Sequence, residues 1–432
     1  MLTSLYTAVS GMNANGTTLS AIGDNIANLN TVGFKGSRVT FGDVLSQTIT
    51  GIAGTSQVGR GALVNDISPV FTQGSFETTT SALDLAIDGD GFFAVSDGGA
   101  RYYTRAGQFQ MDKQGNIVNP DGMILQGYLA DPSGNITGGT GDMQIAVSQS
   151  PANSTTSSTI SVNLNAFDAV KAAAFTLDGN NDGIDNDPAN FNYSSSVTVY
   201  DSQGGAHEVS LYFVKTASNA WSAHYVYTDP ANPGEFTDAG TQVLTFNSDG
   251  GLINDNSNTA ISFNFGASVT SPQSITFNYG TGTAESSTSD GLDGSTQFAS
   301  NFSVMNLTQN GYSAGSLKNV TIAEDGIVSG VFTNGQTRVI GRIALTRFTA
   351  PTGLTKLGRN LYAEAFASGP PIIGMPNSSG MGRVLSNTLE LSNVDLAEEF
   401  VKMISAQRGF QANSRIITTV DELTQELVNL KR

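Results

Sequence analysis

The sequence predicts a mainly β protein with α-helical termini, and three observations support this prediction. Apolar residues recur at heptad spacing at both ends of the 432-residue chain, which is typical of helices that pair along a narrow seam. Glycine is frequent, with 49 residues, and only 13% of the residues are charged, as in chains with many tight turns. Between the ends, short alternating apolar runs are separated by Asp-Gly and Asn-Gly turn signals, which favour antiparallel strands. We therefore expect paired terminal heptad helices, an extended connector and two nested all-β domains.

The C-terminal helix is expected to begin near Ser392 and to run to Arg432. Ser392 followed by Asp395 predicts a capping box at its start. Apolar residues in this stretch stand seven apart in three series, with Phe400 beside them: Leu396, Met403, Phe410 and Ile417; Ile416, Leu423 and Leu430; Val420 and Leu427. This seam is too narrow to be the buried side of a globular core, so the helix needs a partner helix.

The first thirty residues are expected to form that partner. A heptad series runs through them and is flanked by further apolar residues: Leu5, Met12, Leu19 and Ile26; Leu2, Val9, Ile22 and Leu29. The segment has a single charged residue, Asp24, and three glycines, each of which weakens a helix by roughly 1 kcal/mol relative to alanine. We expect this helix to be unstable alone and to form only when it packs against other helices.

Two arrangements of the terminal helices are consistent with this spacing. The two ends can form an antiparallel coiled-coil stalk within one monomer. Alternatively, they can build the inner wall of a polymer, in which small residues let neighbouring backbones approach closely. In the polymer, the apolar residues of both helices would be the assembly interface. The pattern alone leaves both arrangements open.

The overall composition limits the partners and the chemistry. A net charge of −17 disfavours a nucleic-acid backbone as a partner. The chain has no cysteine, which excludes disulfides and thiol chemistry. No apolar run approaches the ~18 residues of a membrane span, so no membrane insertion is expected. The N-terminus lacks the basic region and the continuous apolar core of a secretory signal peptide, so export would need another route.

A first β-region is expected to follow residue 75. Residues 92–96 and 101–105 flank Asp97-Gly98-Gly99, which predicts a β-hairpin. The same style returns later in the chain, where Asp-Gly and Asn-Gly turns separate predicted strands at 320–322, 327–332 and 338–348. Residues 36 to 75 are rich in Gly, Thr and Ser with weak periodicity, and we expect them to be extended.

Residues 147–290 differ in charge from the rest of the chain. They hold fourteen acidic and two basic residues, which gives a net charge of −12. Six alternating segments predict strands at 196–200, 209–214, 221–227, 242–246, 260–265 and 274–279. We expect an all-β domain inserted into the first one, with its like-charged surface facing outward.

These observations predict four nested parts. They are a terminal helical coiled-coil domain, an extended connector, a first β-domain and an inserted acidic outer β-domain, with the boundaries 1–30 plus 393–432, 31–75 plus 356–392, 76–146 plus 291–355, and 147–290. In a polymer, the helical domain would form the inner core.

Motifs at both ends resemble one known family, the bacterial flagellar axial proteins, which include rod, hook and hook-associated proteins. Ser10-Gly11-Met12-Asn13, Ile22 to Asn28 and Val32 to Lys35 are similar to the N-terminal signature of this family. Stretches 389–395 and 407–414 resemble its C-terminal signature. The length and the acidic insertion resemble the hook members rather than the rod members. The N-terminal motif residues are Asn25, Ala27, Asn28, Gly33, Phe34 and Lys35.

The resemblance implies a structural subunit without a cofactor, and not an enzyme. Hook members form a bendable tubular polymer, a universal joint that transmits torque from rod to filament. The implied partners are further copies of the chain, the distal rod protein, the hook cap and the hook–filament junction protein. The implied location is extracellular, in the hook at the basal-body side of the flagellum. Export through the flagellar type III apparatus would need no cleaved signal peptide.

A nucleophile-elbow pattern at 311–315 is interpreted as a Gly-rich turn. In α/β-hydrolases the elbow lies between a strand and a helix, whereas residues 318–322 read as a strand. The two histidines, His207 and His224, precede Ser313, which reverses the hydrolase order. No acidic ligand stands at metal spacing beside both histidines, so no catalytic residue and no histidine metal site is predicted.

One segment has the oxygen density of a calcium loop. The candidate ligands are Asp178, Asn180, Asp182, Asp185 and Asp187, and the first three fit the opening of such a loop. Ala189, however, stands where a closing bidentate carboxylate is needed. The alternative is a solvated Asn/Asp/Gly turn, and any calcium binding is expected to be weak.

Two other functions remain as alternatives. Within the family, the chain can be a rod or hook-associated protein, although the insertion at 147–290 argues against a rod. From a different class, it can be a secreted β-rich hydrolase or carbohydrate-binding protein built on the acidic domain. Electron microscopy of the purified protein discriminates between these classes, because only a subunit polymerises.

Overall fold

The structure is a computed structural model, in which the chain divides into two compact units. Unit 1 comprises residues 1–148, 318–331 and 337–432, and unit 2 comprises residues 149–317 and 332–336. The fold is mainly β with two terminal helices that pack together, as the sequence predicts. The described residues are 2–44, 47–51, 54–131, 134–145, 149–172, 174–177, 190–229, 236–256, 259–286 and 288–429.

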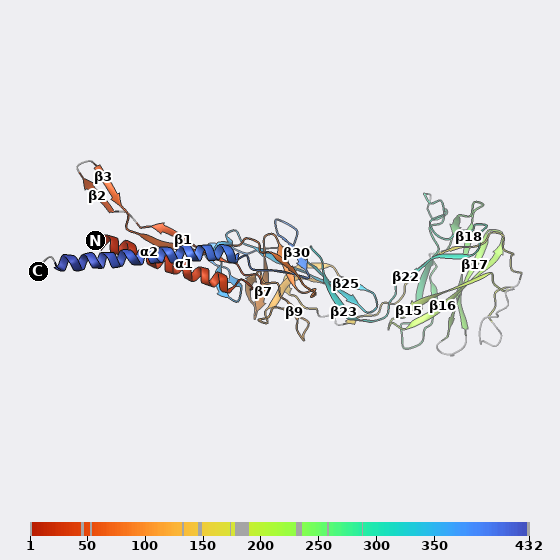
Figure 1. Ribbon diagram of the computed structural model, residues 1–432. Coiled ribbons are helices and arrows are strands. Elements are labelled where there is room, and N and C mark those ends of the chain that lie inside the picture. Colours follow the sequence, from red (N-terminus) through yellow and green to blue (C-terminus); the bar gives the residue numbers. More distant parts are fainter. Residues whose placement is uncertain are drawn as a thin grey trace. The chain divides into compact units, whose positions relative to one another are not determined.

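The two helices of unit 1 are α1 (Leu2–Ala27) and α2 (Leu396–Asn429), which lie side by side and antiparallel (Figure 1). They approach closely at glycines, since Gly11 lies against the side chain of Asn413 and Gly409 lies against that of Asn15. Gly11, which weakens α1 as an isolated helix, therefore also permits the close contact with Asn413. Among the described residues, neither helix combines the length and the hydrophobicity needed to cross a membrane.

The start of α2 differs from the prediction. Asp395 is its N-cap, because Oδ1 of Asp395 accepts hydrogen bonds from the N–H groups of Ala397 at 2.8 Å and Glu398 at 3.0 Å. Oγ of Ser392 instead accepts from the N–H of Val394 at 3.3 Å. The predicted capping box at Ser392 is therefore wrong. A cap must directly precede the first helical turn, and Asp395 occupies that place.

A β-ribbon follows α1 in the segment that was expected to be extended. Strand β1 (Ser37–Asp43) pairs antiparallel with β4 (Ala62–Pro69), and β2 (Gln47–Gly51) pairs with β3 (Gly54–Val58). The ribbon lies against α1, where Oγ of Ser10 accepts a hydrogen bond from the N–H of Ala62 at 3.3 Å. The Gly, Thr and Ser content hides the apolar alternation that would have predicted these strands.

The main sheet of unit 1 has the strand order β24-β25-β11-β7-β8-β28-β27. The predicted hairpin is confirmed, because Gly98 and Gly99 adopt φ values of 55° and 94° in the turn between β7 and β8. The aromatic core beside it includes Phe92, Tyr103 and Tyr362. The strands are β7 (Phe92–Asp97), β8 (Ala100–Thr104), β11 (Ile124–Ala130), β24 (Ile327–Phe332), β25 (Thr337–Ile343), β27 (Thr355–Gly358) and β28 (Leu361–Ala363).

Shorter elements complete unit 1. Strand β31 (Thr388–Glu390) pairs with β5 (Phe76–Thr78), and β30 (Arg383–Ser386) pairs with β6 (Leu85–Asp88). The segment that leads into α2 is thereby tied to the segment that enters the first β-domain. The remaining elements are β9 (Gln110–Met111), β10 (Ile117–Val118), β12 (Ile136–Asp142), β26 (Leu345–Arg347), β29 (Ile372–Gly374) and the 3₁₀ turns Pro351–Gly353 and Phe366–Ser368.

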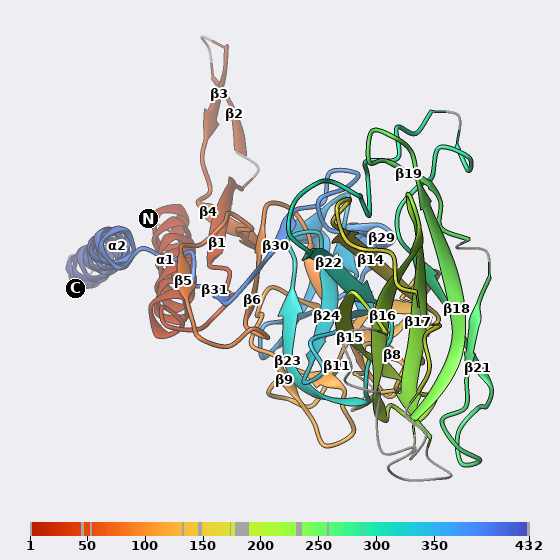
Figure 2. The ribbon, with the colours of Figure 1, turned by 90° about the vertical axis from the view of Figure 1, so that its right-hand side faces the viewer.

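Unit 2 contains two sheets with the orders β15-β16-β17-β18-β19 and β20-β21-β14-β22. Strands β16, β17 and β18 stand side by side (Figure 2). In addition, β13 (Gln149–Ser150) pairs with the start of β23 (Gly315–Ile322). The strands of the two sheets are β14 (Ser157–Asn163), β15 (Tyr193–Tyr200), β16 (Ala206–Ala217), β17 (Ala220–Thr228), β18 (Phe236–Phe246), β19 (Leu252–Asn254), β20 (Ile261–Phe263), β21 (Gln273–Asn278) and β22 (Ser303–Gln309).

All six strands predicted for residues 147–290 are present, as β15 to β18, β20 and β21. Alternating side chains of both sheets form one core that includes Trp221, Phe213 and Phe277. Because every second residue points to this core, the alternation was legible in the sequence. The other face is mixed, because it also carries Val214 and Val226, which are buried outside this core, and Val243, which is exposed.

Candidate assembly surface and helix junction

The contact between α1 and α2 uses a seam that the apolar heptads predict only in part. On α2, Glu399, Ala406, Asn413 and Val420 stand seven residues apart, and Glu399 and Ala406 are buried. Asn413 packs against Gly11 of α1. Three of these four side chains, Glu399, Ala406 and Asn413, are small or polar, so a pattern of large apolar residues does not include them. Their heptad spacing is the feature of the sequence that indicates this seam.

Part of the predicted interface is buried or half-buried within the single chain. Leu5 of α1 and Ile417 and Val420 of α2 line one open groove of about 900 Å³, so the structure brings these three residues together. Ile22 is buried, with 4% of its surface exposed. The half-buried members are Leu5, Met12, Leu19, Ile26, Leu29, Met403, Ile417 and Val420.

Another part of the predicted interface is exposed in the single chain. The exposed members are Val9, Leu396, Phe400, Phe410, Ile416 and Leu423. Tyr6, Val401 and Ile404, which were not predicted, are exposed as well. Large apolar side chains gathered on a surface mark an interaction site. The side chains of Leu2 and Leu427, and Leu430 as a whole, lie outside the described residues.

Asn25, the first residue of the N-terminal motif, joins the end of α1 to β1 and α2. Its Oδ1 accepts from the N–H of Ser37 at 2.8 Å, and its Nδ2 donates to the carbonyl of Ser37 at 3.0 Å. The same Nδ2 donates to Oε2 of Glu399 at 3.2 Å, while Lys402 Nζ donates to Oε1 of Glu399 at 2.8 Å. This buried amide thus fixes where the chain leaves α1, because each of its polar atoms has a defined partner.

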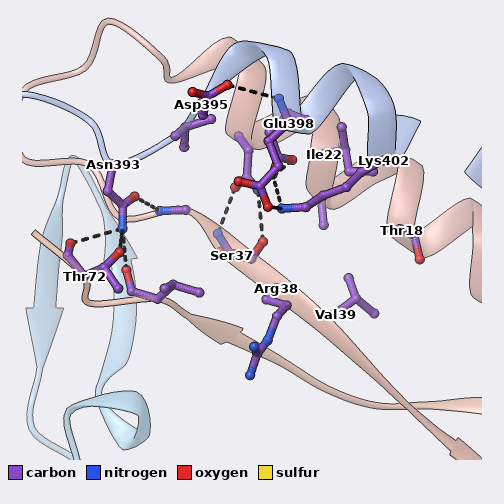
Figure 3. A pocket seen from close by; sticks show the side chains of 16 residues that line it. Thr18, Ile22, Ser37, Arg38, Val39, Thr72, Asn393, Asp395, Glu398 and Lys402 are labelled. Carbon is purple, nitrogen blue, oxygen red and sulfur yellow. Dashed lines mark hydrogen bonds and ion pairs between the residues drawn. The ribbon is translucent and has the colours of Figure 1, made fainter. Parts of the chain in front are cut away.

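Asn393 makes an equivalent connection in front of α2 (Figure 3). Its Oδ1 accepts from the N–H of Gly36 at 2.9 Å, and its Nδ2 donates to the carbonyl of Val70 at 2.8 Å and to Oγ1 of Thr72 at 2.9 Å. Asn25 and Asn393 line a hollow of about 350 Å³ that α1, β1 and the start of α2 enclose. Together these two amides hold both helices to β1 and to the segment after β4.

A buried ionic cluster continues this junction into the first β-domain. Nζ of Lys35 lies 2.5 Å from Oε1 of Glu390 and donates to the carbonyl of Thr72 at 2.8 Å. Arg105 Nη1 lies 3.4 Å from Oε2 of Glu390. The side chains of Lys35 and Glu390 are fully buried. Burial lowers the pKa of Lys35, and the attraction of Glu390 offsets this only in part; burial likewise lowers the pKa of Arg105.

The other motif residues shape the turn between α1 and β1. Gly33 has a φ of 68°, and a Cβ there would lie 2.5 Å from the backbone nitrogen of Ala106. Phe34 is buried, and Nζ of Lys356 stands 4.6 Å above its ring centroid. Asn28 accepts from Oγ1 of Thr31 at 3.2 Å, and Ala27 is exposed. All of these contacts lie within one chain, so the motif positions the helices relative to the first β-domain.

The candidate chemical sites do not assemble into a reactive centre. Nε2 of His207 pairs with Asp201 and Nδ1 of His224 pairs with Asp238, each at 2.8 Å, so each histidine is hydrogen-bonded to a different carboxylate. Strand β23 begins two residues after Ser313, where a hydrolase elbow would begin a helix. The calcium-loop candidates Asp178, Asn180, Asp182, Asp185 and Asp187 lie outside the described residues. Within the described part, no three acidic or histidine side chains group as metal ligands.

Comparisons with known proteins identify the family. Residues 163–312 match the family model "Flagellar basal body protein FlaE D2 domain", and residues 86–164 match "Flagellar hook protein FlgE/F/G D1 domain". Residues 5–35 match "Flagella basal body rod protein", and residues 385–430 match "Flagellar basal body rod FlgEFG protein C-terminal". The flagellar hook protein FlgE of Borreliella burgdorferi is 38% identical to this chain over the full length of both. The chain belongs to the flagellar hook protein FlgE family.

Other FlgE proteins also align with this chain over nearly their full length. The FlgE of Salmonella typhimurium is 36% identical and aligns over 98% of this chain and 99% of its own. A crystal structure of Helicobacter pylori FlgE2 has a TM-score of 0.51 with 17% identity, covering 73% of this chain and all of that chain, which supports the fold alone. As a FlgE family member, the chain is a structural, non-enzymatic subunit of the flagellar hook. The hook is an extracellular part of the flagellum, in whose axial structure the chain polymerises.

Proposed function

We propose that the paired terminal helices form the inner wall of the hook and that their exposed apolar residues are the contacts between copies. The observation that carries this proposal is the set of large apolar side chains on α2 that a single chain leaves uncovered, among them Phe400, Ile416 and Leu423. Burying such surface is the main favourable term in protein association. The contact between α1 and α2 holds the two helices side by side, and this helical pair presents the exposed side chains.

The junction at Lys35, Glu390 and Asn25 supports the mechanical part of the proposal. Its buried ion pair and amide bonds tie the helical pair to the first β-domain, so torque on the wall passes to the outer parts without loss of orientation. The predicted nested parts, 1–30 with 393–432, 31–75 with 356–392, 76–146 with 291–355, and 147–290, are kept as the proposed division. Polar contacts between outer domains would slide, and the tube would bend.

The finer partners belong to this proposal as well. A hook subunit at the ends of such a tube would meet the distal rod protein, the hook cap and the hook–filament junction protein. Export through the flagellar type III apparatus would deliver the chain to the growing end. The acidic outer domain, with its net charge of −12 over residues 147–290, would keep the outer surface of the tube solvated.

Electron microscopy of the purified chain tests the proposal. With precipitant or salt, the full chain is expected to form tubes, while a variant without residues 1–30 and 393–432 is expected to stay folded, soluble and monomeric. Restoring either end alone should give no tubes, because each helix then lacks its partner. Tubes formed by the doubly truncated variant would contradict the assignment of the wall to the terminal helices.

A further inference from the structure

Two stripes of exposed apolar side chains lie at opposite ends of the helical pair and on different helices. The tip stripe consists of Tyr6 and Val9 on α1, which are 70% and 36% exposed. The base stripe is formed by residues in the first turns of α2, Leu396, Phe400, Val401 and Ile404, which are 40% to 68% exposed. A single chain covers neither stripe.

Both stripes point away from the contact between the two helices. Residues four apart share one side of an α-helix, so Leu396, Phe400 and Ile404 stand in one row. The buried Glu399 and Ala406 occupy the side that faces α1. On α1, Tyr6 is exposed while Ala8, two positions away, is 1% exposed. The stripes are therefore free surfaces and are not parts of the internal seam.

The stripes of one chain cannot meet each other. Because Gly11 lies against Asn413 and Asn15 against Gly409, Tyr6 and Val9 lie beside the stretch of α2 around residue 416. The base stripe is centred about 16 residues earlier, which corresponds to ~24 Å at ~1.5 Å per helical residue. The two stripes are thus separated along the axis of the helical pair.

We propose that the tip stripe of one copy docks on the base stripe of a second copy, displaced along the helix axis by ~24 Å. A second copy is the occupant because the chain polymerises and because it carries two different apolar stripes that it cannot join itself. A contact between two different patches is head-to-tail, and because each copy is displaced along the axis, the array cannot close into a flat ring and extends as an open helix, as a tube requires. This inference rests on the proposed role of the terminal helices as the wall.

The charges around the stripes fit such a contact. Residues 1–23 contain no charged side chain, so docking of the tip stripe removes no charge of α1 from water. Beside the base stripe, Lys402 Nζ lies 3.0 Å from Oε1 of Glu398, and both side chains are about half exposed or more. This ion pair would remain at the solvated rim, where it limits sliding of the apolar contact.

Cross-linking within the tubes tests the pairing. The chain has no cysteine of its own, so Tyr6→Cys with Val401→Cys introduces the only thiols. A disulfide needs Cα atoms within ~7 Å, and oxidation of assembled tubes should give a ladder of covalent oligomers. The matched control is Asn13→Cys with Val401→Cys. Asn13 is exposed on the same side of α1 but lies ~10 Å further along the axis, so it should give no ladder.

The outcomes separate this inference from the proposed function. Tubes that give no ladder with the first pair, or an equal ladder with the control pair, would overturn the stripe pairing and leave the helical wall intact. Absence of tubes from the unaltered chain would refute the proposed function and this inference with it. If the first pair fails to assemble, Val9→Cys with Phe400→Cys takes its place. As a second readout, Val401→Asp should abolish tubes, whereas Gln411→Asp, at an exposed polar position of α2, should not.

Discussion

Lys35 and Glu390 form a fully buried ion pair, with Nζ of the lysine 2.5 Å from Oε1 of the glutamate. Lys35 follows α1 and Glu390 precedes α2, so this pair joins the two ends of the chain at the base of the helical pair. Arg105 brings a third charge from the first β-domain. The cluster therefore connects the segments next to both terminal helices to the first β-domain.

Removal of the shared carboxylate should strongly destabilise unit 1. Glu390→Ala leaves Lys35 and Arg105 buried without their partner, and breaking a buried pair in this way costs about 3–5 kcal/mol. The matched control is Arg383→Ala, because Arg383 pairs with Asp88 and Glu324 at the surface and such pairs contribute at most about 1 kcal/mol.

Calorimetry of both variants measures this difference, and the fluorescence of the single Trp221, which lies in the core of unit 2, reports that unit separately. A loss below about 1 kcal/mol for Glu390→Ala, equal to that of the control, would mean that the cluster does not hold the junction.

Gly33 and Gly16 should respond to alanine in opposite directions. Gly33 has a positive φ, and its new Cβ would meet backbone atoms of Arg105 and Ala106 at 2.6 and 2.5 Å, so Gly33→Ala should disrupt the turn and lower the melting temperature of unit 1. A Cβ at Gly16 meets nothing within 4 Å, so Gly16→Ala should stabilise α1 by about 0.5–1 kcal/mol. Circular dichroism melts of tubes assembled from the two variants would refute this account if both changes had the same sign.

The paired carboxyl of Asp201 should make unit 2 sensitive to acid. Burial raises the pKa of Asp201, but hydrogen bonds from His207 and from the backbone N–H groups of Gly205 and Gln203 outweigh it and hold the pKa below the ordinary 3.8. A carboxyl with a depressed pKa stabilises the fold above its unfolded pKa, and this stabilisation is lost as the pH falls below about 3.8.

Asp201→Asn should therefore lower the melting temperature of unit 2 at pH 5, and the difference from the unaltered chain should shrink as the pH falls below about 3.8. Asp249→Asn, at an exposed turn position, serves as the control and should change little at either pH. A difference between Asp201→Asn and the parent that stays constant down to pH 2.5 would exclude the ionised carboxylate as its cause.

The segment 178–187 is expected to bind calcium weakly or not at all. Ala189 stands in the place of the closing carboxylate, so the loop lacks its bidentate ligand. Titration calorimetry with calcium should show no binding tighter than roughly 0.1 mM, near the weak range of extracellular modules. An isotherm in the micromolar range would disprove this and would identify calcium as a ligand of the outer domain.

Elements whose residues repeat a local pattern could be predicted from the sequence. The strands of unit 2 alternate core and surface side chains, and both helices carry heptads, so their existence followed from periodicity alone. The start of α2 was misjudged by three residues because both Ser392 and Asp395 are good capping residues and the sequence did not decide between them. The β1–β4 ribbon was missed because its alternation is weak.

The junction could not be predicted because its partners are distant in the chain. Lys35 and Glu390 are 355 residues apart, and a single sequence contains no signal that links them. The family resemblance pointed to Asn25, Gly33 and Lys35 but not to their contacts. Asn413 is polar and stands outside the predicted apolar series, and its contact with Gly11 is visible only in the structure. Local patterns thus predict elements, whereas tertiary pairs of polar residues need the structure.

The central claim is that α1 and α2 serve assembly and are not merely a stalk within one monomer. In α1, the three glycines and the single charge of residues 1–30 make an isolated helix marginal, and ordering each residue costs about 1–2 kcal/mol. Amide hydrogen exchange on the monomer and on assembled tubes tests the claim most directly. We predict rapid exchange in both helices of the monomer and strong protection in the tubes. Equal protection of both helices in the monomer would contradict the claim and favour the intramolecular stalk.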